Sequence, residues 1–454
     1  MRSAHTNLAG APWASVRERY AKGKALRSRL PREEQGAWKP VDRGELVDRI
    51  VASVAGRRRA LLPIRWKRMA ASPFGFFRGA AAIMAADVGA LRTAGLEVQV
   101  CGDAHLLNLG AYAAPDGHLV FDLNDFDETC RGPFEWDLKR LAASLVVGGR
   151  DAGNRESACV DAVRSMVRSY REALARFSRT QVLELARLEI TPRRTGRSAS
   201  PVFARAARDT PQKLIQKATL PARDGFARFR SRPPLLRRLK AAEARRVLAA
   251  LGPYRAALGP ARQQVIDRYA PRDLAFKVVG TGSVGVDDYL VLLYGNGPED
   301  PLFLQVKEED ASCWTPYLRS ARTVPAAGAH EGRRVAEGQL RAQTVSDPFL
   351  GWTRGGGKDF LVRQWSDHKA SIGVDLLTGP ALGDLAVLCG EVLAKAHART
   401  GDAAMLAGYC GKSGRLDDAI SAFAVAYADR TEADHEAFRR AARSGDLTPA
   451  PGRA

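Results

Sequence analysis

Cysteine is scarce in this sequence, and its spacing argues against cross-links or structural metal. Six cysteines are spread over 454 residues, and no two of them form a Cys-x-x-Cys pair. A disulfide framework or a zinc site needs denser, paired cysteines, so reduced thiols are expected.

Long apolar stretches are also missing. No segment approaches the roughly 18 apolar residues that cross a membrane. Residues 1–22 contain arginines but no continuous apolar core of a secretory signal. We therefore expect no membrane span and a cytoplasmic location.

Positive charge, in contrast, is abundant. Lysine and arginine total 70 against 50 acidic residues, which gives a formal net charge of +20, and arginine is dense between residues 187 and 246. Such a field attracts nucleic acid, anionic lipid or phosphorylated ligands, although a solvated basic face has the same composition. Aromatic side chains that would stack on single-stranded nucleic acid are few there. Binding of nucleic acid through the Arg-rich region stays an open alternative.

The order of patterns along the chain predicts several units, as its length suggests. Residues 1–60 are expected to be a basic, mostly helical lead-in. Residues 61–270 are expected to form a helical lobe with an Arg-rich insertion near 187–246. Within it, residues 191–234 are expected to hold long loops or an exposed insertion. Residues 271–366 change to strand patterns, and 367–454 return to helical patterns expected to pack on the helical lobe. The main strand patterns of the β-rich unit are 274–279, 288–294, 302–307, 349–353 and 360–365, with a helical pattern at 333–345.

The segment 102–137 carries the candidate chemistry. Asp103 and Asn108 lie on a polar loop after an apolar strand pattern, so a carboxylate and an amide oxygen can face one small site. Four acidic residues then fall within seven positions: Asp122, Asp125, Asp127 and Glu128. A cation relieves their mutual repulsion, and hard oxygen ligands of this kind suit Mg²⁺, which completes its shell with phosphate and water. The segment therefore predicts metal-assisted phosphoryl transfer.

This order of residues resembles the catalytic segment of kinase-like small-molecule phosphotransferases, the aminoglycoside and choline kinase type. The matching features are Gly102-Asp103, Asn108, Asp122 with Asp125, and the turn Gly132-Pro133 before Asp137-Leu138. The resemblance implies that Asp103 is the catalytic base and that Asp137 braces the loop. It also implies that Asn108 and Asp122 hold Mg²⁺ or Mn²⁺, with Asp125 as a second acid. His105 is a further catalytic candidate.

A second group of residues resembles the nucleotide half of such a kinase. Gly280, Gly282, Ser283 and Gly285 belong to a Gly-x-Gly-x-x-Gly segment between two strand patterns, where a kinase-like loop covers the phosphates of ATP. A dinucleotide-binding loop would instead precede a helix. Lys307 resembles the lysine that pairs with the phosphates. By the same resemblance, Glu337 is its helical ion-pair partner, with Glu331 as the alternate, and Gln364 lies in the hinge beside the adenine. Asp287 departs from the pattern, because the kinase loop has Val there.

The nucleotide half follows the catalytic segment, which reverses the order of an ordinary kinase. We therefore expect an α+β, protein-kinase-like two-lobe fold that is circularly permuted, with a small antiparallel β nucleotide lobe and a larger helical lobe. Permutation is physically tolerable because chain termini usually lie at the surface. The segment 396–402 lacks the Asn that a second catalytic loop would need, and the roles of His397, Arg399 and Asp402 stay open.

Most of the chain also resembles a bacterial family known only as domain of unknown function 2252. The resemblance spans roughly residues 74–434. It is carried by Phe76-Phe77-Arg78-Gly79, residues 101–110, 121–142 and 280–285, Val362-Arg363-Gln364 and residues 396–402. That family implies no settled activity.

The leading hypothesis is an ATP- and Mg²⁺-dependent phosphotransferase that acts on an unknown small molecule or protein, with phosphoryl and nucleotidyl transfer both open. Residues 102–137 and 280–307 should then face each other across one cleft. A metallophosphoesterase, which also begins with Gly-Asp-x-His, would need Gly-Asn-His-Asp and Gly-His-x-His segments that the seven histidines do not form. A nucleotide-binding pseudokinase and a protein that binds nucleic acid or phospho-ligands through the basic region are the alternatives.

Overall fold

The computed structural model describes residues 13–39, 44–195, 198–319, 328–365 and 368–447. The helices are α1 Val16–Ala25, α2 Leu46–Ala52, α3 Leu62–Ala70, α4 Pro73–Gly79, α5 Ala81–Gly89, α6 Phe134–Asp151, α7 Glu156–Phe177, α8 Val182–Ala186, α9 Pro192–Thr195, α10 Ser200–Arg208, α11 Pro211–Ala218, α12 Ala241–Ala257, α13 Pro260–Ile266, α14 Glu331–Ala342, α15 Pro380–Thr400, α16 Ala403–Cys410 and α17 Arg415–Ser444. The strands are β1 Glu97–Val100, β2 Leu109–Ala113, β3 Leu119–Leu123, β4 Cys130–Pro133, β5 Thr219–Pro221, β6 Ala227–Phe229, β7 Leu236–Arg238, β8 Ala270–Lys277, β9 Asp288–Tyr294, β10 Pro301–Glu308, β11 Gly351–Gly355, β12 Lys358–Gln364 and β13 Ala370–Ser371. Helices and antiparallel sheets are both prominent, so the predicted α+β class is confirmed.

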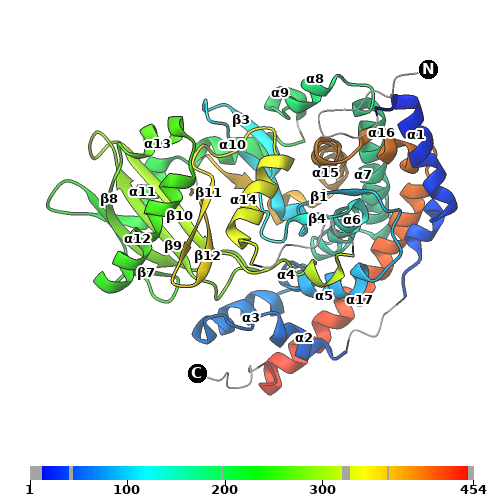
Figure 1. Ribbon diagram of the computed structural model, residues 1–454. Coiled ribbons are helices and arrows are strands. Elements are labelled where there is room, and N and C mark those ends of the chain that lie inside the picture. The colour runs from blue at the N-terminus through cyan, green and yellow to red at the C-terminus, as the bar shows by residue number, and fades with distance from the viewer. Residues whose placement is uncertain (1–12, 40–43, 196–197, 320–327, 366–367, 448–454) are drawn as a thin grey trace.

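A six-stranded antiparallel sheet with the order β11-β12-β10-β9-β8-β7 forms the β-rich part of the molecule (Figure 1). Successive side chains of a strand point to opposite faces. In β10, Leu304 and Val306 therefore pack in one hydrophobic cluster with Tyr254 of α12. The intervening Gln305 and Lys307 are buried on the other face. This alternation places a buried lysine at the end of the strand.

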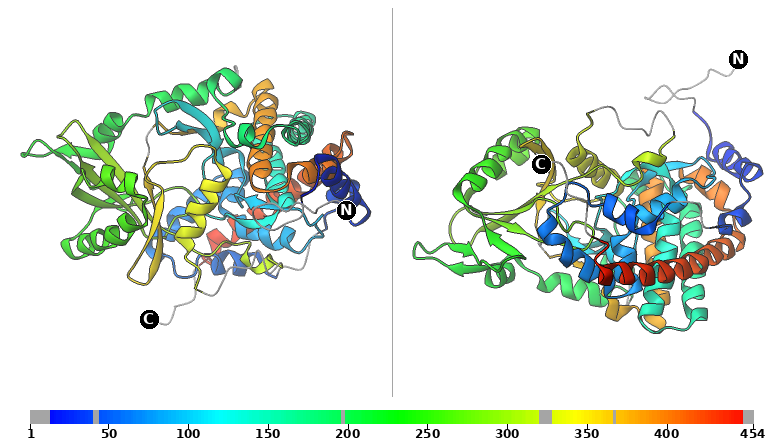
Figure 2. Two further views of the ribbon diagram at one scale, coloured as in Figure 1. Left: turned by 45° about the horizontal axis from the view of Figure 1, so that its top comes forward. Right: turned by 90° about the horizontal axis from the view of Figure 1, so that it is seen from below.

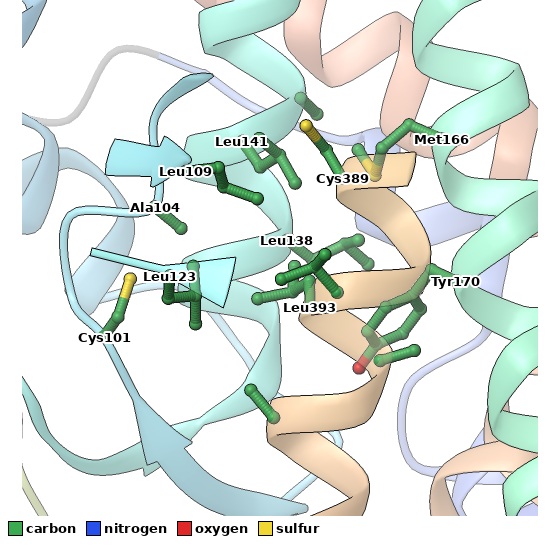
Figure 3. Close-up of a cluster of buried hydrophobic side chains, with 14 of the residues drawn as sticks. Cys101, Ala104, Leu109, Leu123, Leu138, Leu141, Met166, Tyr170, Cys389 and Leu393 are labelled. Carbon is green, nitrogen blue, oxygen red and sulfur yellow. The ribbon is translucent and has the colours of Figure 1, made fainter. Parts of the chain in front are cut away.

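The larger part of the molecule is helical, and its core supports the predicted catalytic segment. Helix α6 is buried along nearly its whole length, as expected for a helix enclosed by others. Cys101, Ala104, Leu109 and Leu123 belong to one hydrophobic cluster with side chains of α6, α7 and α15, part of which Figure 3 shows. The loop after β1 and the hairpin β2–β3 are therefore built on rigid helices.

Helix α14 lies between the two parts (Figure 1). It contacts β11 and β12 on one side and α15 and β1 on the other. The N-terminal helices complete the molecule: α1 packs on α16, and α2, α3 and α4 contact α17 (Figure 2). The close packing of α1 on α16 requires glycine, since a Cβ at Gly408 would lie 2.1 Å from the carbonyl oxygen of Tyr20.

The described part of the Arg-rich stretch holds helices and strands, so of the two expectations for residues 191–234, long loops or an exposed insertion, the long loops are wrong. The stretch contains α9 to α12 and three short strands, and β7 pairs with β8 of the main sheet. Arginines there are compatible with folded structure because several form ion pairs. Arg237 lies 3.0 Å from Glu243, and Arg238 lies 3.0 Å from Asp273. The sheet therefore recruits residues well before the predicted boundary at 271.

No helix among the described residues is long and apolar enough to cross a membrane.

Candidate functional site

The loop after β1 is held by Asp137, in the first turn of α6. Its carboxylate accepts hydrogen bonds from the backbone N–H groups of Cys101, at 2.7 Å, and Gly102, at 2.9 Å. Gly102 has φ of 81°, and a Cβ there would lie 2.1 Å from the carbonyl oxygen of Glu128. Glycine is the residue that tolerates both constraints. This geometry agrees with the bracing role expected for Asp137.

Asp103, Asn108 and His105 share this loop. Asn108 Nδ2 donates to the backbone oxygen of Asp103 at 2.9 Å, and Arg140 Nε donates to Asp103 Oδ1 at 2.8 Å. His105 is buried, and burial lowers the pKa of its imidazole to about 3, so the ring is neutral at physiological pH. Its Nε2 lies 3.8 Å from Asp103 Oδ2, and its buried Nδ1 has no hydrogen-bond partner.

Asp127 connects the two parts of the molecule. Ser283 Oγ, in the glycine loop between β8 and β9, donates to Asp127 Oδ2 at 3.0 Å, and Lys307 forms an ion pair with the same oxygen. Lys307 Nζ also lies 3.4 Å from Glu309 Oε1. The segment after β3 therefore meets the glycine loop and the strand lysine across about 180 residues of chain.

Charge is crowded at this point. Burial raises the pKa of Asp125 to about 6, and the neighbouring Asp127 carboxylate adds to that rise. Burial opposes ionisation of Asp127 as well, but the attraction of Lys307 outweighs it and lowers the pKa of Asp127 below its ordinary value. Burial also raises the pKa of Glu309. Asp127 Oδ1 is buried and has no hydrogen-bond partner among the residues that the structure describes.

These groups line one cavity of about 380 Å³, which we call the central cavity. Its walls come from residues 103–128, the glycine loop at 280–283, residues 307–313, and four arginines, Arg49, Arg57, Arg65 and Arg78. The cavity thus brings together Asp103, His105, Asn108, Asp125, Gly280, Gly282, Ser283 and Lys307 of the predicted site residues.

The glycine loop is held by arginines from the N-terminal helical region. Arg65 Nη1 donates to the carbonyl oxygen of Thr281 at 3.0 Å, and Arg57 Nη1 donates to that of Val284 at 3.3 Å. Arg68 donates to the carbonyl oxygen of Gly280. Gly285, with φ of 100°, lets the loop lie close to this region, because a Cβ there would be 2.9 Å from Arg57 Cβ. Sequence reasoning missed these arginines, because no local pattern links them to a loop more than 200 residues away.

The predicted metal role of Asp122 requires correction. Asp122 is buried within β3, where its side chain pairs with Lys395 of α15 and accepts from the N–H of Leu123 at 2.9 Å. It does not line the central cavity. A residue inside a paired strand stays on a face of its sheet, whereas Asp125 and Asp127 follow the end of the strand and reach the cavity.

The predicted pairing of Glu337 with Lys307 is also wrong. Glu337 pairs with Arg333 at 2.6 Å and Arg341 at 2.9 Å, which are four residues away on either side along α14. Helix α14 is tied to the acidic segment instead by Arg334, which donates to the carbonyl oxygens of Thr129, at 2.6 Å, and Asp127, at 2.9 Å. The alternate, Glu331, pairs with Arg334.

Gln364 lies outside the central cavity and lines a second one of about 210 Å³ with Asn124 and Lys369. Next to it, Arg363 Nε donates to Gln305 Oε1 at 2.8 Å, and Gln305 Nε2 donates to Asp288 Oδ2 at 2.8 Å. Burial raises the pKa of Asp288 to about 7. Gln305 of this network lies on the same face of β10 as Lys307.

The segment 396–402 is structural. His397 is buried, with Nδ1 2.8 Å from the hydroxyl of Tyr170 and Nε2 3.4 Å from Asp137 Oδ2, so it supports the loop brace. Arg399 donates to the carbonyl oxygens of Ala186 and Gln343. Asp402 caps α16.

Within the described parts of the chain, no group of three or more His, Cys, Asp or Glu side chains could hold a metal ion by itself. A cation in the central cavity would therefore depend on one or two carboxylates together with oxygens of a ligand. That is the usual coordination of Mg²⁺ in nucleotide sites.

Comparison with known proteins gives a family and no activity. Residues 57–441 match the family described as "Uncharacterized protein conserved in bacteria (DUF2252)". No curated protein and no solved structure gives a significant match.

Proposed function

The chain belongs to the DUF2252 family, and we propose that it is an ATP- and Mg²⁺-dependent phosphotransferase with a circularly permuted, kinase-like fold. The observation that carries the proposal is the double contact of Asp127, which meets both Ser283 of the glycine loop and Lys307 of β10. Acidic groups, a glycine loop and a buried lysine in one cavity are the parts that phosphoryl transfer needs, since catalysis there is mostly positioning and charge neutralisation.

The topology of the β-rich part supports the same proposal. The glycine loop joins β8 to β9, Lys307 lies near the end of β10, and α14 follows before the hairpin β11–β12. Strand β12 returns to pair with β10, where Val306 lies opposite Val362. A permuted order leaves this spatial arrangement unchanged.

The residues present fit a Mg²⁺ ion bound with the nucleotide. Asp125 and Asp127 are the carboxylates in reach of the cavity, and the buried, unpartnered Oδ1 of Asp127 is a free ligand atom. Asn108 contributes an amide oxygen from the facing loop. Bound there, Mg²⁺ would neutralise charge on the phosphate oxygens.

The remaining roles follow from position. Lys307 pairs with phosphate oxygens in place of part of its contact with Asp127, and the glycine loop covers them. Asp103 orients or deprotonates the acceptor hydroxyl, and Arg140 fixes the direction of its carboxylate. Charge-assisted bonds of this kind are short and directional.

A nucleotide-binding protein without turnover is the second candidate. The observation that favours it is the ion pair of Asp103 with Arg140, which already occupies one oxygen of the proposed catalytic carboxylate. The nucleic-acid alternative is less favoured, because arginines of the basic stretch pair with acids, among them Arg194 with Glu391 at 2.9 Å and Arg228 with Asp224 at 2.8 Å.

Two variants separate an enzyme from a binding protein. We expect Asp103→Asn to keep ATP affinity and to lose about 10²–10⁴-fold in slow ATP hydrolysis, the usual contribution of a general base. We expect Lys307→Met to weaken ATP binding and turnover together. ADP release and calorimetric ATP affinity measure both. Wild-type turnover that Asp103→Asn does not reduce would contradict the catalytic role, and nucleotide binding without any turnover would favour the second candidate.

A further inference from the structure

One wall of the central cavity has no role in the function proposed above. It is formed by α2, α4 and the start of α5, which contribute Arg49, Arg78, Gly79, Ala81 and Ala82. These elements lie N-terminal to the catalytic segment, and no part of the kinase-like resemblance covers them. Arg78 belongs to the Phe76-Phe77-Arg78-Gly79 motif.

The packing of helix α4 places the side chain of Arg78 at the central cavity. Helix α4 begins at Ser72, whose hydroxyl accepts from the N–H of Gly75 at 3.1 Å, with Pro73 at the first helical position. Phe76 and Phe77 are each only 2% exposed and anchor the helix in two different hydrophobic clusters. Arg78 is left at the cavity side of the helix.

The arginines around the cavity fall into two groups. Arg57 and Arg65 are committed to the carbonyl oxygens of the glycine loop, and Arg140 is committed to Asp103. In contrast, the side chains of Arg49 and Arg78 make no hydrogen bond or ion pair with any residue that the structure describes, and Nε of each is buried without a partner. Two uncommitted guanidinium groups therefore face one cavity.

The guanidinium groups of Arg49 and Arg78 are suited to binding an anion. Burial lowers the pKa of Arg78, whereas Asp103 and Asp125 act in the opposite direction. A guanidinium nevertheless stays protonated in proteins. Arg49 and Arg78 are only partly buried, but Nε of each is buried, and a buried polar group without a hydrogen-bond partner is unfavourable. The carboxylate of Asp103 is already paired with Arg140, and neither acid bonds to Arg78.

We propose that Arg78 and Arg49 form a binding site for a phosphate group, on the wall of the central cavity contributed by α2 and α4. The planar donor fork of arginine matches the oxygens of phosphate. Because Arg78 and Asp103 line the same cavity, the phosphate would share that cavity with the proposed acceptor group. It is either the terminal phosphate of the nucleotide or a phosphate carried by the acceptor. Only this choice between sources rests on the proposed function.

The first measurement needs no nucleotide. Inorganic phosphate and pyrophosphate are titrated calorimetrically, without metal, into the full-length wild type, Arg78→Gln and Arg49→Gln. Arg164→Gln is the matched control, because Arg164 is an exposed arginine on α7 outside the cavity. We expect Arg78→Gln to weaken binding by about ten- to a hundredfold, the usual effect of losing hydrogen bonds to a charged group. Equal affinity of wild type and Arg78→Gln, or an equal loss in the control, would overturn the proposal.

Stability gives an independent check, since Arg78 lacks a partner in the free protein. Arg78→Gln should melt at the temperature of the wild type or above it. A marked fall in melting temperature would show a structural role instead. Arg78→Lys, which keeps the charge but loses the fork, should bind phosphate with intermediate affinity.

Two further titrations, with Mg²⁺ present, identify the source of the phosphate. If it is the terminal phosphate of the nucleotide, Arg78→Gln weakens binding of ATP and leaves that of ADP unchanged. If it belongs to the acceptor, both nucleotide affinities are unchanged, and inorganic phosphate binds to the wild type saturated with ADP but not to the variant. Phosphate binding that needs Arg78 in a protein that binds no nucleotide would refute the proposed function and leave the anion site standing. If the protein binds nucleotide and no affinity for any ligand changes in Arg78→Gln, the anion site is refuted and the proposed function stands.

Discussion

Replacing Lys307 by methionine removes the charge that holds the centre of the site. Lys307 is 3% exposed, and its ammonium group contacts Asp127 and lies 3.4 Å from Glu309. Burial alone would lower the pKa of Lys307, but the two carboxylates outweigh it and raise that pKa. Without the ammonium, the one side-chain partner that Asp127 keeps among the described residues is Ser283, whose hydroxyl donates to it at 3.0 Å. Breaking a buried pair by removing one partner costs about 3–5 kcal/mol, so we expect a loss of that size in the free energy of unfolding.

The pH dependence of this loss follows from the carboxylate. In the wild type, the pKa of Asp127 is lower in the folded state than its ordinary value of 3.8. The ionised carboxylate therefore stabilises the fold at pH values above 3.8, and this stabilisation is lost as the pH falls through the folded-state pKa. In Lys307→Met, only Arg363 and the hydrogen bond from Ser283 still oppose the effect of burial, so we expect the pKa of Asp127 to rise. Protonation of Asp127 at lower pH then removes the buried charge. The difference in the free energy of unfolding between wild type and variant should therefore be smaller at pH 5 than at pH 7.5.

Urea unfolding at both pH values tests this reasoning, with Asp127→Asn and the double variant Lys307→Met/Asp127→Asn beside it. The double variant removes both charges and keeps an oxygen that can accept from Ser283. It should therefore be more stable than Lys307→Met alone. A loss below about 1 kcal/mol in Lys307→Met, the range of surface ion pairs, or a double variant no more stable than the single one, would refute the reasoning.

Three further predictions concern neighbouring groups. The pKa of Asp125 is raised to about 6, and a cation binds the deprotonated form, so the affinity for Mg·ATP should rise as the pH increases through 6. In Asp125→Asn, calorimetry should show weaker binding, and the pH dependence that remains should be that of the nucleotide's own titration. Lys395→Met should lose about 3–5 kcal/mol of stability in urea, because Asp122 is left buried and unpaired, while the folded fraction keeps its nucleotide affinity; a selective loss of affinity would return Asp122 to the metal site. Glu337→Ala should change stability by less than about 1 kcal/mol and leave nucleotide affinity unchanged, and a large loss of affinity would contradict the observed pairing of Lys307.

The parts of the site that could be predicted from sequence are those set by short spacing and strand pattern. Asp103 and Asp125 come shortly after strands, Asn108 lies on the same loop as Asp103, and Lys307 is near the end of a strand whose apolar alternation is clear. Their meeting in one cavity was therefore foreseeable. Asp122 was misplaced because spacing alone does not show whether a residue stands inside a paired strand or beyond its end.

Other features depend on contacts that no local pattern reveals. Glu331 and Glu337 are both on α14, and neighbouring arginines compete for each of them, so the sequence could not indicate that Lys307 pairs with Asp127. Helix α2 reaches the cavity only through tertiary packing, which is why Arg49 gave no signal. In the Arg-rich stretch, composition predicted loops, but ion pairs such as Arg238 with Asp273 allow strand β7 to join the sheet.

The measurement that tests the central claim most directly is thermal unfolding of the wild type with ATP, ADP, GTP and AMP, each with and without Mg²⁺. A ligand that binds the native state raises the melting temperature as its concentration exceeds its dissociation constant. The proposed site predicts a concentration-dependent rise with ATP that requires Mg²⁺ and is reduced in Lys307→Met. If no nucleotide shifts the melting temperature under either condition, the central cavity is not a nucleotide site and the proposed function is wrong.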